Sequence, residues 1–178
     1  MLSVIIPVLN GADALPAALA AVRDTADEVI VVDGGSVDGS RALAVRAGAR
    51  VIEAPAGRGV QLAAGADAAS GDWLLFLHAD TRLDADWRIV ADRFAQGPRA
   101  DRSAAYFTLA FDDAGPGARR VARLADWRAR RLGLPYGDQG LLIGRRLYEA
   151  VGGYRPLPLM EDVDLVRRLG RRRLTRLP

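Results

Sequence analysis

Short apolar runs alternate with segments of helical composition along the first half of the chain. Such runs, bounded by polar or glycine-rich residues, are typical of strands buried on both faces of a sheet. Pro16 is compatible with a helix only in its first turn. The predicted strands are 2–8, 28–32, 50–54 and 73–77, and the predicted helices are 12–23, 40–47 and 60–69. This order predicts βαβ units, and hence an α/β fold with a mostly parallel central sheet flanked by helices.

The second half of the chain is less regular. Trp87, Val90 and Phe94 recur at helical spacing within 84–96, which predicts an amphipathic helix with these side chains in the core. The other predicted elements are a strand at 103–111, a basic helix at 118–132 after the chain break Gly115-Pro116-Gly117, a short apolar run at 141–143, one or two helical turns at 145–151, an irregular segment with Gly152, Gly153, Pro156 and Pro158, and a helix from 160 to about 173.

Length and composition indicate one globular domain. A chain of 178 residues is long enough for one well-buried domain and short for two. The absence of cysteine excludes disulfides and thiolate metal sites. The apolar run at the N-terminus has no basic leader and is too short for a signal peptide or a membrane span, so we expect a cytoplasmic protein.

Basic charge is concentrated in the last third. Residues 1–118 contain 10 arginines and 16 acidic residues, whereas residues 119–178 contain 15 arginines and 6 acidic residues. No RNA-binding motif with interleaved aromatic residues accompanies the arginines, so we expect no nucleic-acid partner. The helix at 118–132 can be read as a membrane-surface helix. The more common arrangement is a solvated basic face with the apolar stripe of Val121, Leu124 and Trp127 on the core.

Polar side chains follow each predicted strand of the first half, namely Asn10, Asp33, Arg58 and Asp80. The carboxyl ends of strands in an open α/β sheet are where ligands bind, so this repeated placement predicts a site there. His78 and Asp80 suggest a metal or phosphate site; the alternative is that Asp80 caps the following turn and His78 only ends the strand. Arg58 lies between two glycines and is suited to pair with a phosphate.

Two loops carry further candidates. In the glycine-rich loop after 28–32, Asp33 can accept hydrogen bonds from a ribose or a base, and Asp38 is interpreted as a helix cap; a purely structural turn is the alternative. Later in the chain, Glu161 and Asp162 open a helix, where the helix dipole favours acidic residues. They could equally supply a general base.

Five segments occur in this order: SVIIPVLN, VVDGGSVDGS, GRGVQLAAGADAASGDWLLFLHADT, PYGDQG and GGYRPLPLMEDVDLVRRL. Through these segments the chain resembles the family 2 glycosyltransferases over nearly its whole length. The chain is most similar to the small bacterial "transferase 2, rSAM/selenodomain-associated" group. The resemblance implies a single-domain GT-A fold, with a nucleotide-sugar-binding half at 1–114 and an acceptor and catalytic-base half at 115–178. It also implies an inverting, non-processive transfer from a UDP- or GDP-type sugar to an unknown acceptor hydroxyl.

The resemblance also implies roles for individual residues. Asp162 would be the catalytic base, with Glu161 beside it, and Asp80 would hold a divalent metal, Mg²⁺ or Mn²⁺. The donor would be bound by Pro7, Asn10, Asp33, Gly34, Arg58, His78 and Ala79. Asp138 and Gln139 would lie on the acceptor side.

Three features depart from the family pattern. His78 stands where most relatives have the first aspartate of Asp-x-Asp, which removes one hard metal ligand. The Gln-x-x-Arg-Trp motif of processive synthases is absent. The chain also stops sooner than relatives usually do, which leaves a truncated acceptor half open.

Other readings stay open at this point. One is a nucleotide-binding or interaction module that has lost catalysis. Another is a nucleotidyltransferase, although such an enzyme would want a lysine after the first strand and the chain has no lysine. A homodimer and peripheral membrane contact through the basic last third also remain open.

Overall fold

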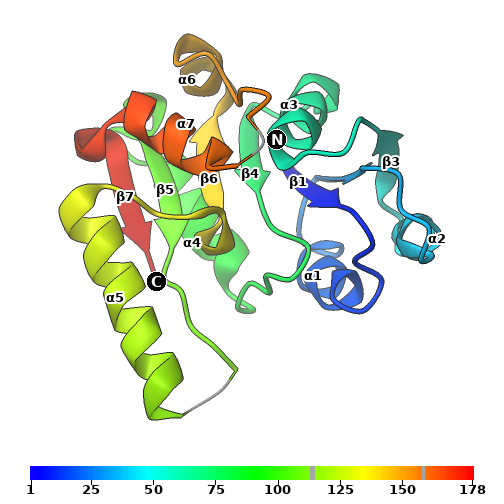
Figure 1. Cartoon of the computed structure of the whole chain (residues 1–178). Coiled ribbons are helices and arrows are strands. Elements are labelled where there is room, and N and C mark those ends of the chain that lie inside the picture. Colours follow the sequence, from blue (N-terminus) through cyan, green and yellow to red (C-terminus); the bar gives the residue numbers. More distant parts are fainter. Residues whose placement is uncertain (113–114, 158) are drawn as a thin grey trace.

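Seven strands form one sheet in residues 1–112, 115–157 and 159–178, which the computed structural model describes (Figure 1). The strands are β1 (Leu2–Val8), β2 (Glu28–Asp33), β3 (Arg50–Glu53), β4 (Trp73–Phe76), β5 (Ala104–Phe107), β6 (Leu141–Gly144) and β7 (Leu174–Leu177). Their spatial order is β3-β2-β1-β4-β6-β5-β7. β6 pairs antiparallel with both β4 and β5, and every other pair is parallel. The predicted mostly parallel sheet is confirmed.

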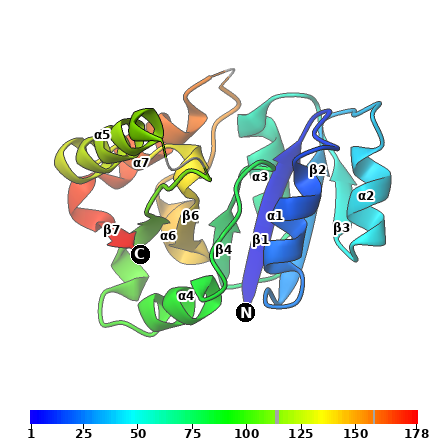
Figure 2. The same cartoon turned by 90° about the horizontal axis from the view of Figure 1, so that it is seen from below.

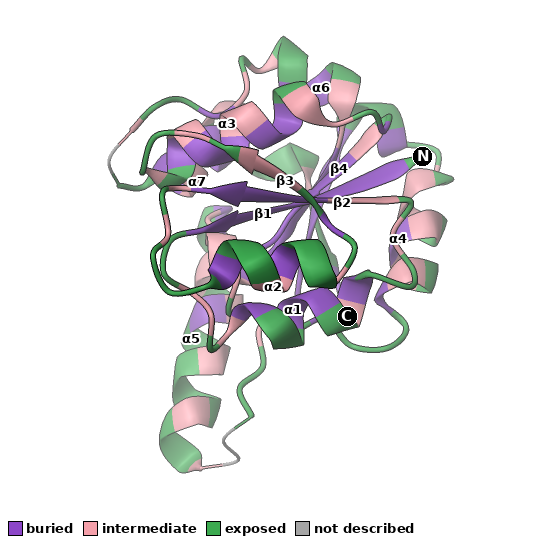
Figure 3. Ribbon diagram, turned by 90° about the vertical axis from the view of Figure 1, so that its right-hand side faces the viewer, coloured by how far each residue is buried: buried purple, intermediate pink, exposed green. Residues whose placement is uncertain are grey.

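Helices cover both faces of this sheet (Figures 2 and 3). The helices are α1 (Leu15–Val22), α2 (Ser40–Arg46), α3 (Arg58–Ala68), α4 (Trp87–Ala95), α5 (Pro116–Leu132), α6 (Arg145–Ala150) and α7 (Glu161–Leu169), with short 3₁₀ turns η1 (Ala100–Arg102), η2 (Gly137–Gln139) and η3 (Arg171–Arg173). One core layer joins α1, α2 and α4 to the sheet. The other joins α3, α6 and α7 to the opposite face.

The central strands are apolar because both of their faces are covered. Every residue of β1 is buried, and its side chains alternate between the two core layers, with Ile6 in one and Ile5 in the other. Such continuous burial explains why β1 is apolar at every position except Ser3, whose hydroxyl donates a hydrogen bond to Glu28 Oε2. It also fixes the carboxyl ends of β1 and β4 next to each other, since these strands pair in parallel.

Most predicted elements are present, with shifted boundaries. α1 begins at Leu15 rather than at 12, and Pro16 lies in its first turn as expected. α4 begins at Trp87 rather than at 84, and Trp87 is buried in the core. β5 ends at Phe107, four residues before the predicted end. α3 begins at Arg58, so this residue opens a helix instead of lying in a loop before one.

The end of the chain differs most from prediction. α7 ends at Leu169 because Gly170 has a φ of 78°, which ends the helix before the predicted position near 173. Leu174–Leu177 forms β7, which pairs in parallel with β5 and was not predicted. Pro116, predicted to break the chain, instead opens α5, a position that suits proline. Pro158 and the proposed division after 114 lie outside the described residues.

The prediction for the apolar face of α5 is wrong. Val121, Leu124 and Trp127 are 53%, 65% and 55% exposed, and the buried side chains of α5 are Ala125 and Ala129. The small alanines allow the helix backbone to lie close to the body of the protein, while the larger residues face outward. None of the described helices has the length and apolar character needed to cross a membrane.

Candidate functional site

Four charged side chains surround His78, which follows β4 closely. Arg58, Asp80, Asp138 and Asp162 each act electrostatically on its imidazole. Arg58 opens α3, Asp80 follows β4, Asp138 lies in η2 and Asp162 lies in the first turn of α7. The fold therefore gathers predicted residues from four separate segments at the carboxyl end of β4, a central strand of the sheet.

The imidazole of His78 lies directly against the backbone of Gly137. A Cβ atom at position 137 would lie 2.2 Å from His78 Nε2, so only glycine fits there. The Gly137 N–H donates a hydrogen bond to Asp162 Oδ2 at 2.7 Å, and the Val163 N–H donates to Asp162 Oδ1 at 2.7 Å. These two bonds fix the Asp162 carboxylate beside the His78 ring. Each oxygen keeps a second lone pair for a ligand.

Burial shifts the pKa values of two members of this cluster, His78 and Asp138. Burial, and then the Arg58 cation, lower the pKa of His78, although Asp80, Asp138 and Asp162 act in the opposite direction. The imidazole is therefore neutral at neutral pH. Burial raises the pKa of Asp138 against the opposing effects of His78 and Arg128. Asp138 Oδ1 is buried and has no hydrogen-bond partner among the described residues.

Arg58 joins this cluster to Glu161. Its Nε lies 2.9 Å from Glu161 Oε1, where the carboxylate is 1% exposed and the arginine side chain 47% exposed. Neither oxygen of Glu161 accepts an aligned hydrogen bond among the described residues. The ion pair with Arg58 is therefore the main interaction that offsets the cost of burying the Glu161 charge. The guanidinium has four more N–H donors on its terminal nitrogens. Arg58 can thus hold Glu161 and still face a ligand.

Two clefts adjoin the cluster. One, of about 410 Å³, is lined by five of the predicted donor and metal residues together with their neighbours: Pro7, Val8, Leu9, Gly11, Ala14, Gly57, Arg58, Gln61, His78, Ala79 and Asp80. The other, of about 400 Å³, includes Asp138 and Gln139, the two residues predicted on the acceptor side. Asp80 lines both clefts. The arrangement provides separate spaces for two ligands that meet near one carboxylate.

Three predicted donor residues lie beside the first cleft and not in its lining, namely Asn10, Asp33 and Gly34. Asn10 Oδ1 accepts the Val37 N–H at 2.9 Å. The Asp33 carboxylate is buried and accepts the N–H groups of Gly35 and Ser36 at 3.2 to 3.3 Å. These contacts give Asn10 and Asp33 a structural part in the two loops; the predicted contact with nucleotide remains a prediction.

Asp38 ties the same two loops together. Its carboxylate accepts the Ala12 N–H at 2.9 Å and the Ser40 N–H at 3.0 Å. It therefore binds the first N–H of α2, as a cap would, although Gly39 occupies the N-cap position itself. The hydrogen bonds lower the pKa of Asp38, with the Ser40 hydroxyl contributing most.

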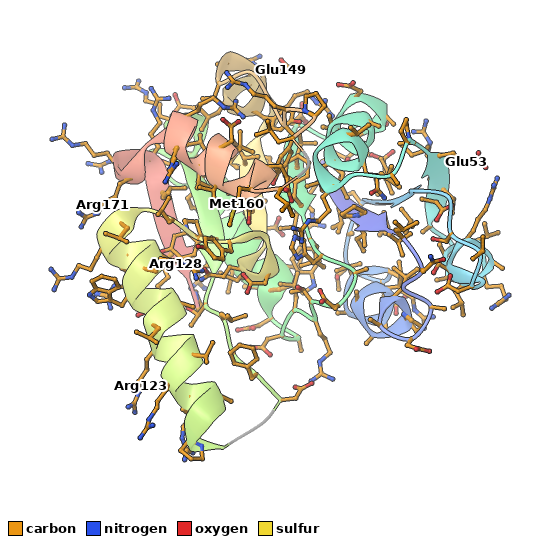
Figure 4. The ribbon with its side chains drawn as sticks, viewed as in Figure 1. Glu53, Arg123, Arg128, Glu149, Met160 and Arg171 are labelled. Carbon is orange, nitrogen blue, oxygen red and sulfur yellow. The ribbon has the colours of Figure 1, made fainter. Side chains whose placement is uncertain are left out.

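Two further residues contribute to the site, Gln61 and Arg128, and the sequence pattern predicts neither of them. Gln61 Nε2 donates to the carbonyls of Val8 at 2.9 Å and Val32 at 2.8 Å, so it joins the ends of β1 and β2 beneath the first cleft. The only indication of Gln61 in the sequence is that its polar side chain occurs within an alanine-rich helix. Arg128, labelled in Figure 4, places its guanidinium 3.3 Å from the centre of the Tyr136 ring, next to η2. No sequence spacing indicated that contact.

The predicted metal site consists of one carboxylate. Within the described ranges, no group of three or more histidine, aspartate or glutamate side chains could hold an ion. Asp80 is the carboxylate that lines both clefts, and the His78 ring is packed on Gly137. Mg²⁺ is commonly bound by one or two carboxylates together with substrate phosphates. The residues present therefore fit an ion that arrives with a diphosphate.

A mostly parallel sheet with charged groups at the carboxyl end of a central strand places the chain among the open α/β proteins that bind ligands at that edge. Residues 3–146 match the family model described as glycosyl transferase family 2, and the chain belongs to this family.

Curated relatives match about half of the chain. A glycosyltransferase of PGL/p-HBAD biosynthesis from Mycobacterium bovis is 43% identical over 93 residues, which are 47% of this chain and 36% of that protein. A TPR repeat-containing protein from Synechococcus elongatus is 42% identical over 82 residues, 43% of this chain and 19% of that protein. The chain thus matches only about a fifth to a third of the length of these relatives.

Solved structures match almost the whole chain. Glucosyl-3-phosphoglycerate synthase from Mycobacterium tuberculosis in complex with Mn²⁺, UDP-glucose and phosphoglyceric acid has a TM-score of 0.72 and 21% identity, over 99% of this chain and 68% of that chain. The same synthase with UDP has a TM-score of 0.70 and 23% identity, over 99% and 69% of the two chains. These likenesses confirm the predicted GT-A fold.

Proposed function

We propose that this protein is an inverting, non-processive glycosyltransferase that moves a sugar from a nucleoside-diphosphate donor to an acceptor hydroxyl. The observation that carries the proposal is the gathering of Arg58, Asp80, Asp138 and Asp162 around His78 where two clefts adjoin. The first cleft takes the donor and the second takes the acceptor. A UDP-type donor is favoured, because the similar M. tuberculosis synthase was solved with UDP-glucose.

Asp162 is proposed as the general base. The acceptor oxygen attacks the anomeric carbon, the bond from that carbon to the diphosphate oxygen breaks, and the acceptor proton passes to Asp162. The two backbone N–H bonds hold its carboxylate in one orientation, which a base must have before the acceptor arrives. Attack from the side opposite the leaving nucleoside diphosphate inverts the anomeric carbon.

The leaving group gathers negative charge, and two residues are proposed to stabilise it. Arg58 donates to the diphosphate through the terminal nitrogens of its guanidinium. Asp80 would hold a divalent ion, Mg²⁺ or Mn²⁺, together with diphosphate oxygens, and such an ion supplies charge stabilisation to a leaving phosphate. Neutral His78 lines the same cleft as Arg58 and Asp80 and adds no negative charge there.

The Asp162→Asn variant tests the proposal. Asparagine keeps an oxygen that accepts the Gly137 N–H but cannot take a proton from the acceptor. Turnover should fall about 100-fold or more while nucleotide binding is nearly unchanged. The readout is UDP release from UDP-glucose, with phosphoglyceric acid and simple sugars as trial acceptors.

Asp164→Asn is the matched control on the same helix. Asp164 pairs with Arg155 and Arg168 rather than with the cluster, so this variant should keep its turnover while it is folded. Equal turnover of Asp162→Asn and wild type would remove Asp162 from the mechanism. Nucleotide binding by a wild type that turns over no donor sugar would favour the binding-module alternative.

A further inference from the structure

Helix α5 presents a large apolar surface to solvent. Leu124 is 65% exposed and Trp127 is 55% exposed, whereas Ala125 and Ala129 on the opposite side of the helix are buried. Figure 1 shows α5 beside β7, with its first turns extending away from the sheet. An ion pair of Asp126 with Arg176 of β7, at 2.9 Å, anchors the helix on its inner side. The outer face has no such role in the fold.

Basic residues frame these apolar side chains on one face. Arg120, Leu124, Trp127 and Arg131 are spaced four, three and four residues apart, which places them along one side of the helix. Arg123 lies next to this row, and all three arginines are exposed. Figure 4 shows Arg123 on the outer side of α5. Asp126 is the only acidic residue of α5, and it faces the body of the protein.

The combination of charge and apolar area selects among partners. Arginines alone would suit nucleic acid, but Leu124 and Val121 make no favourable contact with a phosphate backbone. Two copies of α5 placed face to face would bring their arginines together, which is unfavourable. An anionic bilayer satisfies both features, because aromatic and aliphatic side chains enter the boundary of the acyl chains while arginines contact the headgroups.

We propose that the outer face of α5 docks on an anionic membrane surface, with Leu124 and Trp127 inserted and Arg120, Arg123 and Arg131 on the headgroups. The contact is peripheral. It assigns the membrane contact considered for the whole basic last third of the chain to one face of α5. It does not depend on the proposed transfer reaction, since its test uses no substrate.

Vesicle binding of the full chain tests the inference. Wild-type protein should sediment with vesicles of phosphatidylcholine mixed with phosphatidylserine and remain in solution with pure phosphatidylcholine. Of the three tryptophans, Trp127 is 55% exposed, Trp73 is half-buried and Trp87 is 2% exposed. On binding, the emission of Trp127 should shift to the blue and be quenched by brominated lipid. Trp127→Phe should remove most of that emission change.

A pair of double variants with the same change of charge distinguishes binding through the outer face of α5 from general attraction of a basic protein to anionic vesicles. Arg120→Glu/Arg123→Glu should weaken binding to the anionic vesicles by at least about tenfold. Arg93→Glu/Arg99→Glu makes the same change of charge at exposed positions elsewhere and should weaken it far less. Leu124→Ala should weaken binding while leaving the charge unchanged.

Three results would overturn the inference. One is equal loss of binding in both double variants. Another is no binding of wild type to anionic vesicles, including the case in which it binds nucleic acid or an acidic protein instead. The third is dimerisation that Leu124→Ala abolishes, which would assign this face to a second copy of the chain.

Discussion

At the scale of single residues, the contact between His78 and Gly137 organises the site. The imidazole occupies the volume that any larger residue at 137 would need, and the Gly137 N–H orients Asp162. A histidine at 78 therefore does more than remove a metal ligand. It couples the end of β4 to η2 and α7 by packing, in a position where an aspartate would add another negative charge to three acidic neighbours.

Asp138 is predicted to reduce stability at neutral pH. Its folded-state pKa is raised by burial, so the stability it contributes is present below its unfolded pKa and is lost as pH rises through the folded pKa. Asp138→Asn should therefore raise the free energy of unfolding at neutral pH by up to about 1 kcal/mol. Urea unfolding measures this difference, which should shrink at mildly acid pH.

Exposed Asp13 provides the control for that measurement. Asp13→Asn should change the free energy of unfolding very little at either pH. A destabilised Asp138→Asn at neutral pH would contradict the account, since it would mean that the charged carboxylate is compensated in the folded protein.

The sequence indicated individual site residues better than their contacts. Asp80 was predicted because polar side chains follow each strand at the carboxyl edge of the sheet, and the structure places it in the lining of both clefts; its role stays a prediction. Gln61 escaped because its role depends on two carbonyl groups from β1 and β2, which lie 53 and 29 residues away in sequence. The pairing of Arg58 with Glu161 likewise depends on how α3 and α7 pack, which no local pattern specifies.

At the scale of elements, close approach of α3 to the sheet is a requirement of the site. A Cβ atom at Gly65 would lie 2.4 Å from Ile5 Cγ2 and 2.9 Å from Val32 Cγ2. The helix that begins with Arg58 can therefore sit directly on β1 and β2 only with glycine at this position. The consequence is that Arg58 is held at the carboxyl ends of those strands.

Two glycine-to-alanine variants test this packing. Gly65→Ala should lower the free energy of unfolding by about 1 to 3 kcal/mol, because the methyl group overpacks the core. Gly117→Ala on α5 is the matched control, since a Cβ atom there meets no atom within 4 Å. It should be neutral or slightly stabilising, as alanine favours helix. Chemical denaturation measures both, and an unaffected Gly65→Ala would show that α3 can move outward.

The type of most elements could be predicted from the sequence, but the buried face of each element could be predicted only in part. Apolar runs indicated β1, β2 and β4 because burial on both sides leaves few polar positions, such as Ser3 in β1 and Asp33 at the end of β2. For α5 the same logic failed, since alanines rather than Val121, Leu124 and Trp127 face the body. β7 was missed because the edge strand Leu174–Leu177 has a Thr-Arg centre and a weak pattern.

At the scale of the whole molecule, the sheet joins both halves of the chain. β6 enters between β4 and β5 and runs antiparallel to both, so η2 just before it lies at the carboxyl end of β4. This insertion brings Asp138 to His78 across 60 residues of sequence. A parallel order could be predicted from the βαβ pattern, but strand insertion over that distance depends on the complete fold.

Nucleotide binding is the most direct test of the central claim that this site takes a nucleoside-diphosphate sugar. The measurement is calorimetric titration with UDP and with GDP, each with and without Mn²⁺. It is made on wild type, on Asp80→Asn and on the control Asp67→Asn. Asp67 is exposed and lines neither cleft. We predict that UDP binds, that Mn²⁺ strengthens binding, and that Asp80→Asn alone loses this strengthening. Absence of binding to either nucleotide, with or without the ion, would contradict the account.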